Sequence, residues 1–116
     1  MTHIINSLNE ISHHYDALFV DLWGCVHNGI LAYKAAVEAL IEYREHGGKV
    51  VLVTNSPQPR IAVEKQLLHF NVPKICYDTV ATSGDSARVA MFTGVVGKKI
   101  FFIGEPRDQL FFEPIS

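Results

Sequence analysis

The sequence predicts an α/β protein built on a parallel β-sheet. Short apolar runs of strand length alternate with longer segments in which apolar residues recur at helical intervals. The runs are apolar at successive positions, as in strands that helices cover on both faces. Strands that alternate with helices join through right-handed crossovers and pair in parallel. The chain has 116 residues, which suits one domain over residues 1–116, and no internal boundary is evident.

The first elements are a helix, a strand and a loop. Ser7 and Glu10 have the spacing of a capping box, which predicts a short amphipathic helix in the first segment. The apolar residues that recur there at helical intervals are Ile4, Leu8, Ile11 and Tyr15. Residues 17–21 then form an apolar run that ends on an aspartate, which predicts a buried strand. Residues 22–30 contain two glycines and an asparagine, and this composition indicates a loop or a hairpin.

The remaining elements continue the alternation of helices and strands. Gly47 and Gly48 end a strongly amphipathic segment, and Ser83 is suited to cap the start of a later helix. The run over 99–103 is the third strong strand, after those at 17–21 and 49–54. In order, we predict a helix over 32–46, a strand over 49–54, a helix over 60–70, a short strand near 79–81, a helix over 84–93, a strand over 99–103 and one helical turn before Pro114.

Composition and charge favour an ordered protein without a polyanionic partner. The chain is 48% hydrophobic and 19% charged, which supports a packed core. A formal net charge of −2 gives no electrostatic reason to expect binding to nucleic acid or to an anionic membrane. Cys25 and Cys76 are isolated and lack metal-site spacing, so we expect a reduced, cytoplasmic protein. No secretory signal and no apolar run long enough to span a bilayer are present in the sequence.

Polar groups follow the first two strands at the point where each strand ends. Asp21 closes the first apolar run, and Thr54 and Asn55 close the second. Because parallel strands open at the same edge of a sheet, these groups are expected to lie close together. A rigid carboxylate can act as a nucleophile, while a hydroxyl and backbone N–H groups bind phosphate oxygens as neutral donors. The alternatives are that Asp21 only caps a loop and that the second group is ordinary turn chemistry.

These strings together resemble a known family. Asp21-Leu22-Trp23-Gly24 and Thr54-Asn55 resemble the first two motifs of the haloacid dehalogenase superfamily. The stretches 77–85 and 103–108 resemble its capped sugar-phosphatase and nitrophenylphosphatase branch, and the Asp-Leu-Trp-Gly string resembles one subgroup of predicted hydrolases. The resemblance covers nearly the whole chain and implies a partial Rossmann-like three-layer sandwich. Residues 1–116 would form the N-terminal half of that core, without its second half, the cap domain, the Lys motif or the acidic motif.

The resemblance also implies roles for individual residues. Asp21 would be the nucleophile, forming an aspartyl-phosphate, and a ligand of Mg²⁺ together with the backbone carbonyl of Trp23. Thr54, Asn55 and Gly24 would bind the substrate, a small phosphorylated metabolite. The side chain that serves the family as general acid and base is an aspartate two residues after the nucleophile, where this chain has Trp23. An indole N–H is a donor only and cannot perform that proton transfer.

His27 lies near this motif and titrates in the range that acid–base chemistry needs. It could replace the missing general acid, and the alternative is that it packs in or caps the loop. Three functions therefore stay open from the sequence: a weakly active or inactive Mg²⁺-dependent phosphatase, a non-catalytic module that binds phosphate or a partner, and a self-associating structural fragment. Because the family's fourth strand is absent, strand 17–21 would be an apolar sheet edge, and we expect a homo-oligomer or another pairing through it.

Overall fold

A three-stranded parallel sheet forms the centre of the computed structural model, which describes residues 1–114. Strand β1 (Ala17–Asp21) pairs with β2 (Lys49–Thr54), and β2 pairs with β3 (Thr79–Thr82). The spatial order β1-β2-β3 follows the sequence. The α/β class and the parallel sheet with flanking helices are therefore confirmed, and the short strand expected near 79–81 is β3.

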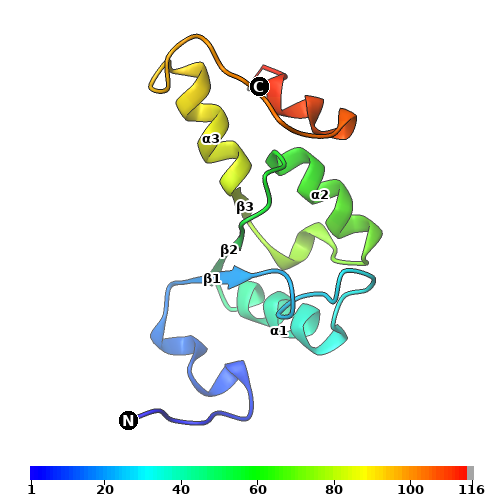
Figure 1. Cartoon of the computed structure of the whole chain (residues 1–116). Coiled ribbons are helices and arrows are strands. Elements are labelled where there is room, and N and C mark those ends of the chain that lie inside the picture. Colours follow the sequence, from blue (N-terminus) through cyan, green and yellow to red (C-terminus); the bar gives the residue numbers. More distant parts are fainter. Residues whose placement is uncertain (115–116) are drawn as a thin grey trace.

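One face of the sheet packs against the helices that connect its strands. Helix α1 (Lys34–Glu45) lies between β1 and β2 in the chain, and α2 (Arg60–His69) lies between β2 and β3 (Figure 1). Leu52 at the middle of β2 is fully buried in one cluster with side chains from both helices. That cluster contains Leu40 and Tyr43 of α1, Val63 and Leu67 of α2, and Val50 and Val80 of the sheet. This core fixes the positions of the strand ends that form the candidate site.

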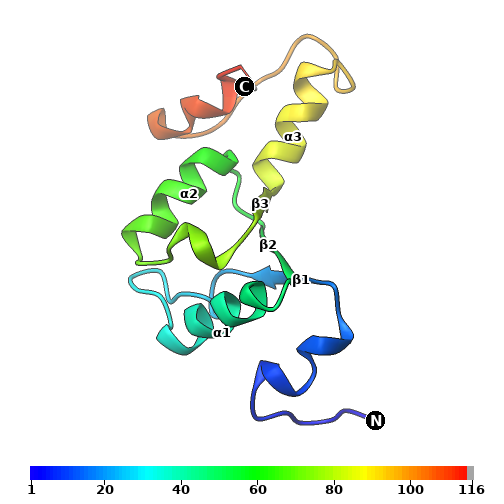
Figure 2. The ribbon, with the colours of Figure 1, turned by 180° about the vertical axis from the view of Figure 1, so that it is seen from behind.

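The opposite face of the sheet is open along β1. Side chains alternate between the faces of a strand, and Phe19 is 80% exposed while Leu18 and Val20 pack toward the core. On the same face of β2, Val53 is 40% exposed. The expectation that strand 17–21 is buried on both faces is therefore wrong for this chain. Helix α3 (Ser83–Phe92) follows β3 directly and points away from the sheet in both views (Figures 1 and 2), so it leaves this face uncovered.

The N-terminal segment is not the amphipathic helix that the sequence predicts. It forms two 3-10 helices, Leu8–Glu10 and Ser12–His14, and neither contains a buried residue. The capping interaction is present, because Glu10 Oε2 accepts a hydrogen bond of 2.8 Å from the backbone N–H of Ser7. A short helix is marginally stable unless an apolar face packs against the protein. Here Leu8 and Ile11 are only half-buried where the segment meets α1, and only single turns form.

Residues 99–103 are not a strand, which corrects the third strong strand of the sequence prediction. Phe101 is 90% exposed, whereas Phe102 turns inward to lie 4.8 Å from Phe112 between ring centroids. Phe102 and Phe112 belong to a small aromatic cluster, with Phe111, at the 3-10 helix η4 (Pro106–Phe112). A strand requires a neighbouring backbone to accept its hydrogen bonds, and an apolar run cannot specify that neighbour. A further 3-10 helix, η3 (Lys74–Cys76), precedes β3.

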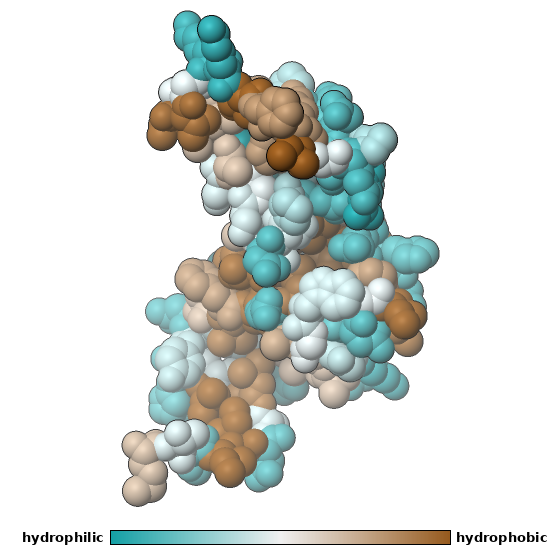
Figure 3. Space-filling view, viewed as in Figure 1, coloured by the Kyte–Doolittle hydropathy of each residue, from teal (hydrophilic) through white to brown (hydrophobic). Residues whose placement is uncertain are grey.

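The molecule is elongated, with extents of 50 × 29 × 28 Å and a radius of gyration of 16.5 Å. A compact chain of about 100 residues has a radius of gyration of about 13 Å. The N-terminus and η4 lie at opposite ends (Figure 1). Apolar surface is visible toward both ends of the molecule (Figure 3). Ile4 and Phe101 are among the exposed apolar residues of the two terminal segments. Within residues 1–114, the helices are too short or too polar to cross a bilayer.

Candidate functional site at the strand ends

Asp21 and Thr54 end neighbouring parallel strands at one edge of the sheet. Asp21 is in register with Val53, so the two strands terminate within one residue of each other. Residues in register share a face, and therefore Asp21 leaves β1 on the open face while Thr54 leaves β2 on the face that the helices cover. Asp21 is exposed, and its Oδ1 accepts a hydrogen bond of 2.9 Å from the backbone N–H of Leu22.

The turn after β2 is held by its own hydroxyl groups. Thr54 is 6% exposed, and its Oγ1 accepts a hydrogen bond of 3.2 Å from the backbone N–H of Ser56. The carbonyl of Ser56 accepts a hydrogen bond of 3.0 Å from the backbone N–H of Gly84 at the start of α3. A Cβ atom at Gly84 would lie 2.2 Å from the carbonyl oxygen of Pro57, so only glycine permits this approach. The start of α3 therefore packs closely against residues 56–58, and this contact holds the turn that follows β2.

The loop after β1 is organised around one carbonyl. The carbonyl oxygen of Leu22 accepts hydrogen bonds from the backbone N–H groups of Cys25, Val26 and His27 at 3.2, 2.8 and 3.3 Å. Gly24 adopts a φ of 78°, in the left-handed region, and its N–H donates to the carbonyl of His27 at 2.8 Å. This conformation favours glycine. The structure therefore gives Gly24 a conformational role in the turn.

Trp23 forms a wall of the site. Its side chain is 59% exposed, and one face of the indole packs against Gly29, where a Cβ atom would lie 2.1 Å from the ring. The imidazole of His27 meets the indole edge-on, with ring centroids 5.1 Å apart. The indole is thus fixed two residues after Asp21, and it supplies an apolar surface there.

His27 is buried, with 1% of its surface exposed, and its ring packs at a tilt of 45° against Phe70, with ring centroids 4.7 Å apart. Its Nδ1 accepts a hydrogen bond of 2.9 Å from the backbone N–H of Gly29. Burial lowers the pKa of His27, so the imidazole is neutral at pH 7 and carries its proton on Nε2. A neutral ring with this tautomer can only donate from Nε2, and this geometry favours the loop-packing alternative over general acid–base chemistry.

A pocket of about 380 Å³ opens at these strand ends. One side is contributed by the loop after β1 and the turn after β2, and the other side by residues 104–108, which include the first turn of η4. The lining residues that matter most for chemistry are Trp23, His27, Thr54 and Asn55 on the first side, and Gly104, Glu105, Arg107 and Asp108 on the second. The structure therefore brings Trp23, Thr54 and Asn55 together, whereas Asp21 and Gly24 do not line this pocket.

The charged residues of the second side were not predicted as site residues. Glu105, Arg107 and Asp108 follow the apolar run over 99–103, so they occupy the same kind of position as Asp21 after the first run. That pattern was the available signal. The pattern was misleading in one respect, because the run is not a strand and the charged residues lie at the start of η4.

The donors available for a metal ion are oxygens. The Asp21 carboxylate and the Trp23 carbonyl are the kinds of ligand that Mg²⁺ prefers, and they lie two residues apart where β1 ends. Residues 1–114 contain no cluster of three or more His, Cys, Asp or Glu side chains suited to a metal ion. Mg²⁺ requires about six oxygen ligands, so these two fit the ion only as part of a set completed by water and substrate.

A parallel α/β sheet with a polar pocket at its carboxyl edge defines the class of protein, an α/β fold of the kind that binds ligands beyond its strand ends. The family model for haloacid dehalogenase-like hydrolases matches residues 18–114, and the chain belongs to that family.

A crystal structure of a hydrolase of the haloacid dehalogenase-like family from Brucella suis 1330 has a TM-score of 0.87 to this structure and 36% sequence identity. The match covers 97% of this chain and 43% of that one, so the chain spans less than half the length of its structural relative. A search of curated proteins found no match.

Proposed function

We propose that this site supports phosphatase-type hydrolysis of a small phosphorylated metabolite, with Asp21 as the nucleophile. The observation that carries the proposal is the register of Asp21 with Val53, which ends two parallel strands together on a carboxylate and on the Thr54-Asn55 turn. Stretches such as Thr82-Ser83-Gly84-Asp85 support the narrower assignment to the capped sugar-phosphatase and nitrophenylphosphatase branch.

In the proposed reaction, a carboxylate oxygen of Asp21 forms a bond to phosphorus while the ester oxygen leaves with its bonding pair. Water then hydrolyses the aspartyl-phosphate, which regenerates Asp21 and releases inorganic phosphate. Thr54 and Asn55, which end the neighbouring strand at the same edge of the sheet, would orient the phosphoryl oxygens as neutral donors. A bound Mg²⁺ would reduce the repulsion between the carboxylate and the phosphate dianion, and the Asp21 side chain and Trp23 carbonyl would hold it.

The surroundings of Asp21 favour substrates with good leaving groups. Trp23 cannot protonate a departing alkoxide, and His27 is neutral with its Nδ1 already engaged. General acid–base catalysis is typically worth about 10²–10⁴ in rate. Esters of acidic alcohols, whose leaving groups need no protonation, are therefore expected to react fastest.

Hydrolysis of p-nitrophenyl phosphate tests the proposal. We expect slow turnover that requires Mg²⁺ and that is lost in Asp21→Asn. Asp16→Asn is the matched control, because Asp16 is also exposed but precedes β1 at the opposite end of the strand. Turnover that persists in Asp21→Asn, or that disappears equally in Asp16→Asn, would contradict the role of Asp21.

A second candidate is a module that binds phosphate without turnover. The observation that favours it is the indole of Trp23, packed against Gly29 at the position of the missing proton-transfer residue. Orthophosphate binding by calorimetry, without measurable hydrolysis, would support this candidate. Either activity fits a reducing compartment, and we propose the cytoplasm, since Cys25 and Cys76 are both free thiols.

A further inference from the structure

The formal charges that line the Thr54 pocket all come from one segment. On the side formed by the loop after β1 and the turn after β2, the lining side chains are neutral, including His27. On the other side, Glu105, Arg107 and Asp108 carry two negative charges and one positive charge. Among the lining residues, Arg107 is thus the one permanent cation. Among the lining side chains, an anionic ligand in this pocket could therefore form an ion pair only with Arg107.

The two acids are engaged within the segment itself. Asp108 Oδ2 accepts a hydrogen bond of 2.8 Å from the backbone N–H of Glu105, which caps the start of η4. Glu105 Oε2 lies 2.9 Å from Arg107 Nε, and both side chains are largely exposed, at 67% and 72%. Within residues 1–114, the terminal amino groups of Arg107 make no hydrogen bond or ion pair, so its guanidinium keeps free donors beside the pocket.

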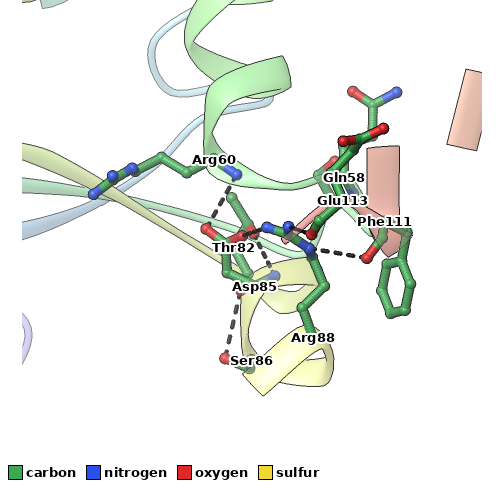
Figure 4. Close-up of polar contacts among 9 residues, drawn as sticks. Gln58, Arg60, Thr82, Asp85, Ser86, Arg88, Phe111 and Glu113 are labelled. Carbon is green, nitrogen blue, oxygen red and sulfur yellow. Dashed lines mark hydrogen bonds and ion pairs between the residues drawn. The ribbon is translucent and has the colours of Figure 1, made fainter. Parts of the chain in front are cut away.

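The segment that carries Arg107 is anchored at its far end. Arg88 of α3 is nearly buried, and its Nε donates a hydrogen bond of 3.0 Å to the carbonyl of Phe111 while a terminal nitrogen donates to the carbonyl of Glu113. A third nitrogen of Arg88 lies 3.3 Å from Asp85, which also accepts a hydrogen bond of 3.0 Å from the backbone N–H of Arg60. Figure 4 shows these contacts joining α2, α3 and the end of η4.

The near end of the segment is restrained as well. Pro106 occupies the first turn of η4, where its fixed φ suits a helix start. A Cβ atom at Gly104 would lie 2.5 Å from the ring of Phe102, so the backbone packs directly on that ring. With both ends held, the segment presents Arg107 to the pocket from a defined position, and recognition by Arg107 would not require the loop to become ordered first.

We propose that Arg107 selects phosphorylated substrates that carry a second anionic group, a carboxylate, and that it binds this group in the pocket that Thr54 also lines. This inference rests on the proposed function, because it assumes that the phosphoryl group lies at the strand ends. An exposed ion pair such as Glu105–Arg107 contributes little stability, so replacing Glu105 by a substrate carboxylate as the partner of Arg107 costs little free energy. A planar guanidinium also matches a carboxylate with two parallel hydrogen bonds.

Calorimetric titration of the full chain with two probes of similar size tests this inference. Phosphoglycolate carries a carboxylate, and ethyl phosphate does not. In the presence of Mg²⁺, we expect the wild type to bind phosphoglycolate about tenfold more tightly, as expected for one charge-assisted contact. Arg107→Ala should remove that preference without changing the affinity for ethyl phosphate. Arg107→Lys should retain part of it, because a lysine keeps the charge but not the two-point geometry.

Lys98→Ala is the matched control, since Lys98 is exposed, carries the same charge and does not line the pocket. It should leave both affinities unchanged. A preference that survives Arg107→Ala, or an equal loss for both probes in that variant, would overturn the inference while the proposed function stands. Failure of the wild type to bind either probe would overturn the proposed function, and this inference with it.

Discussion

Replacing Trp23 with aspartate should convert this site toward an efficient phosphatase. The substitution places a carboxyl group two residues after Asp21, where it can protonate a departing alkoxide. If the site is otherwise competent, the rate on substrates with poor leaving groups should rise by about 10²–10⁴. The rate on p-nitrophenyl phosphate should rise much less, because nitrophenolate leaves without protonation.

The structural cost of this substitution is moderate. Trp23 is 59% exposed, so about two fifths of its surface is buried. For a side chain of about 250 Å², that is roughly 100 Å², or about 2.5 kcal/mol at 25 cal/mol per Å² as an upper estimate. The backbone hydrogen bonds to the Leu22 carbonyl do not involve the indole and should persist. Trp23 is the one tryptophan of the chain, so folding is followed by circular dichroism.

Trp23→Asn is the matched control, since it loses the same packing but cannot transfer a proton. The assay compares the two variants on p-nitrophenyl phosphate and on ethyl phosphate with Mg²⁺. We expect Trp23→Asp to exceed Trp23→Asn on ethyl phosphate by at least tenfold more than on p-nitrophenyl phosphate, about 1.4 kcal/mol of selective transition-state stabilisation. Equal rates for two folded variants on both substrates would refute the assignment of this position to proton transfer.

Three further predictions concern stability and assembly. Asp78→Ala should lower the free energy of unfolding in urea by about 1–3 kcal/mol, because the carboxylate accepts hydrogen bonds from the Val50 N–H at 2.7 Å and from Arg44 at 2.9 Å, and these bonds lower its pKa. Burial lowers the pKa of His27 in the folded protein, so on acidification below about pH 6.5 the unfolded chain takes up the proton first and the free energy of unfolding decreases. The midpoint of urea unfolding should therefore depend less on pH in His27→Gln than in the wild type. We propose that β1 pairs through its free edge, so light scattering should detect oligomers of the wild type and monomers of Phe19→Lys, and a monodisperse wild-type monomer would contradict this.

The elements that the sequence predicted correctly have strong local signals. Helix α1 ends near Gly47, where the chain turns with a φ of 91°, and α3 is capped by Thr82, whose Oγ1 accepts a hydrogen bond from the backbone N–H of Asp85. Predicting the cap at Ser83 was one residue late. The apolar runs of β1 and β2 and the ends of both strands were also predicted, because a buried strand closed by a polar residue is visible in one dimension.

The misplaced elements show where local signals are insufficient. Residues 99–103 are more apolar than Thr79–Thr82, yet the latter form β3. The two segments differ in their place in the chain. After β2, the chain passes through α2 and η3, and Thr79–Thr82 then pair with the edge of β2 before the chain reaches residue 99. The same limit applies to Phe19, whose apolar character predicted burial although no helix within residues 1–114 covers its face of the sheet.

The sequence by itself determined the fold class, the strand ends at Asp21 and Thr54 and the family resemblance, because periodicity and short motifs are properties of neighbouring residues. Only the tertiary structure decided which side chains share the pocket. It placed Arg107 and Thr54 in the lining of one pocket and turned Asp21 toward the other face. The register of two strands and the path of a distant segment depend on contacts between residues far apart in the chain.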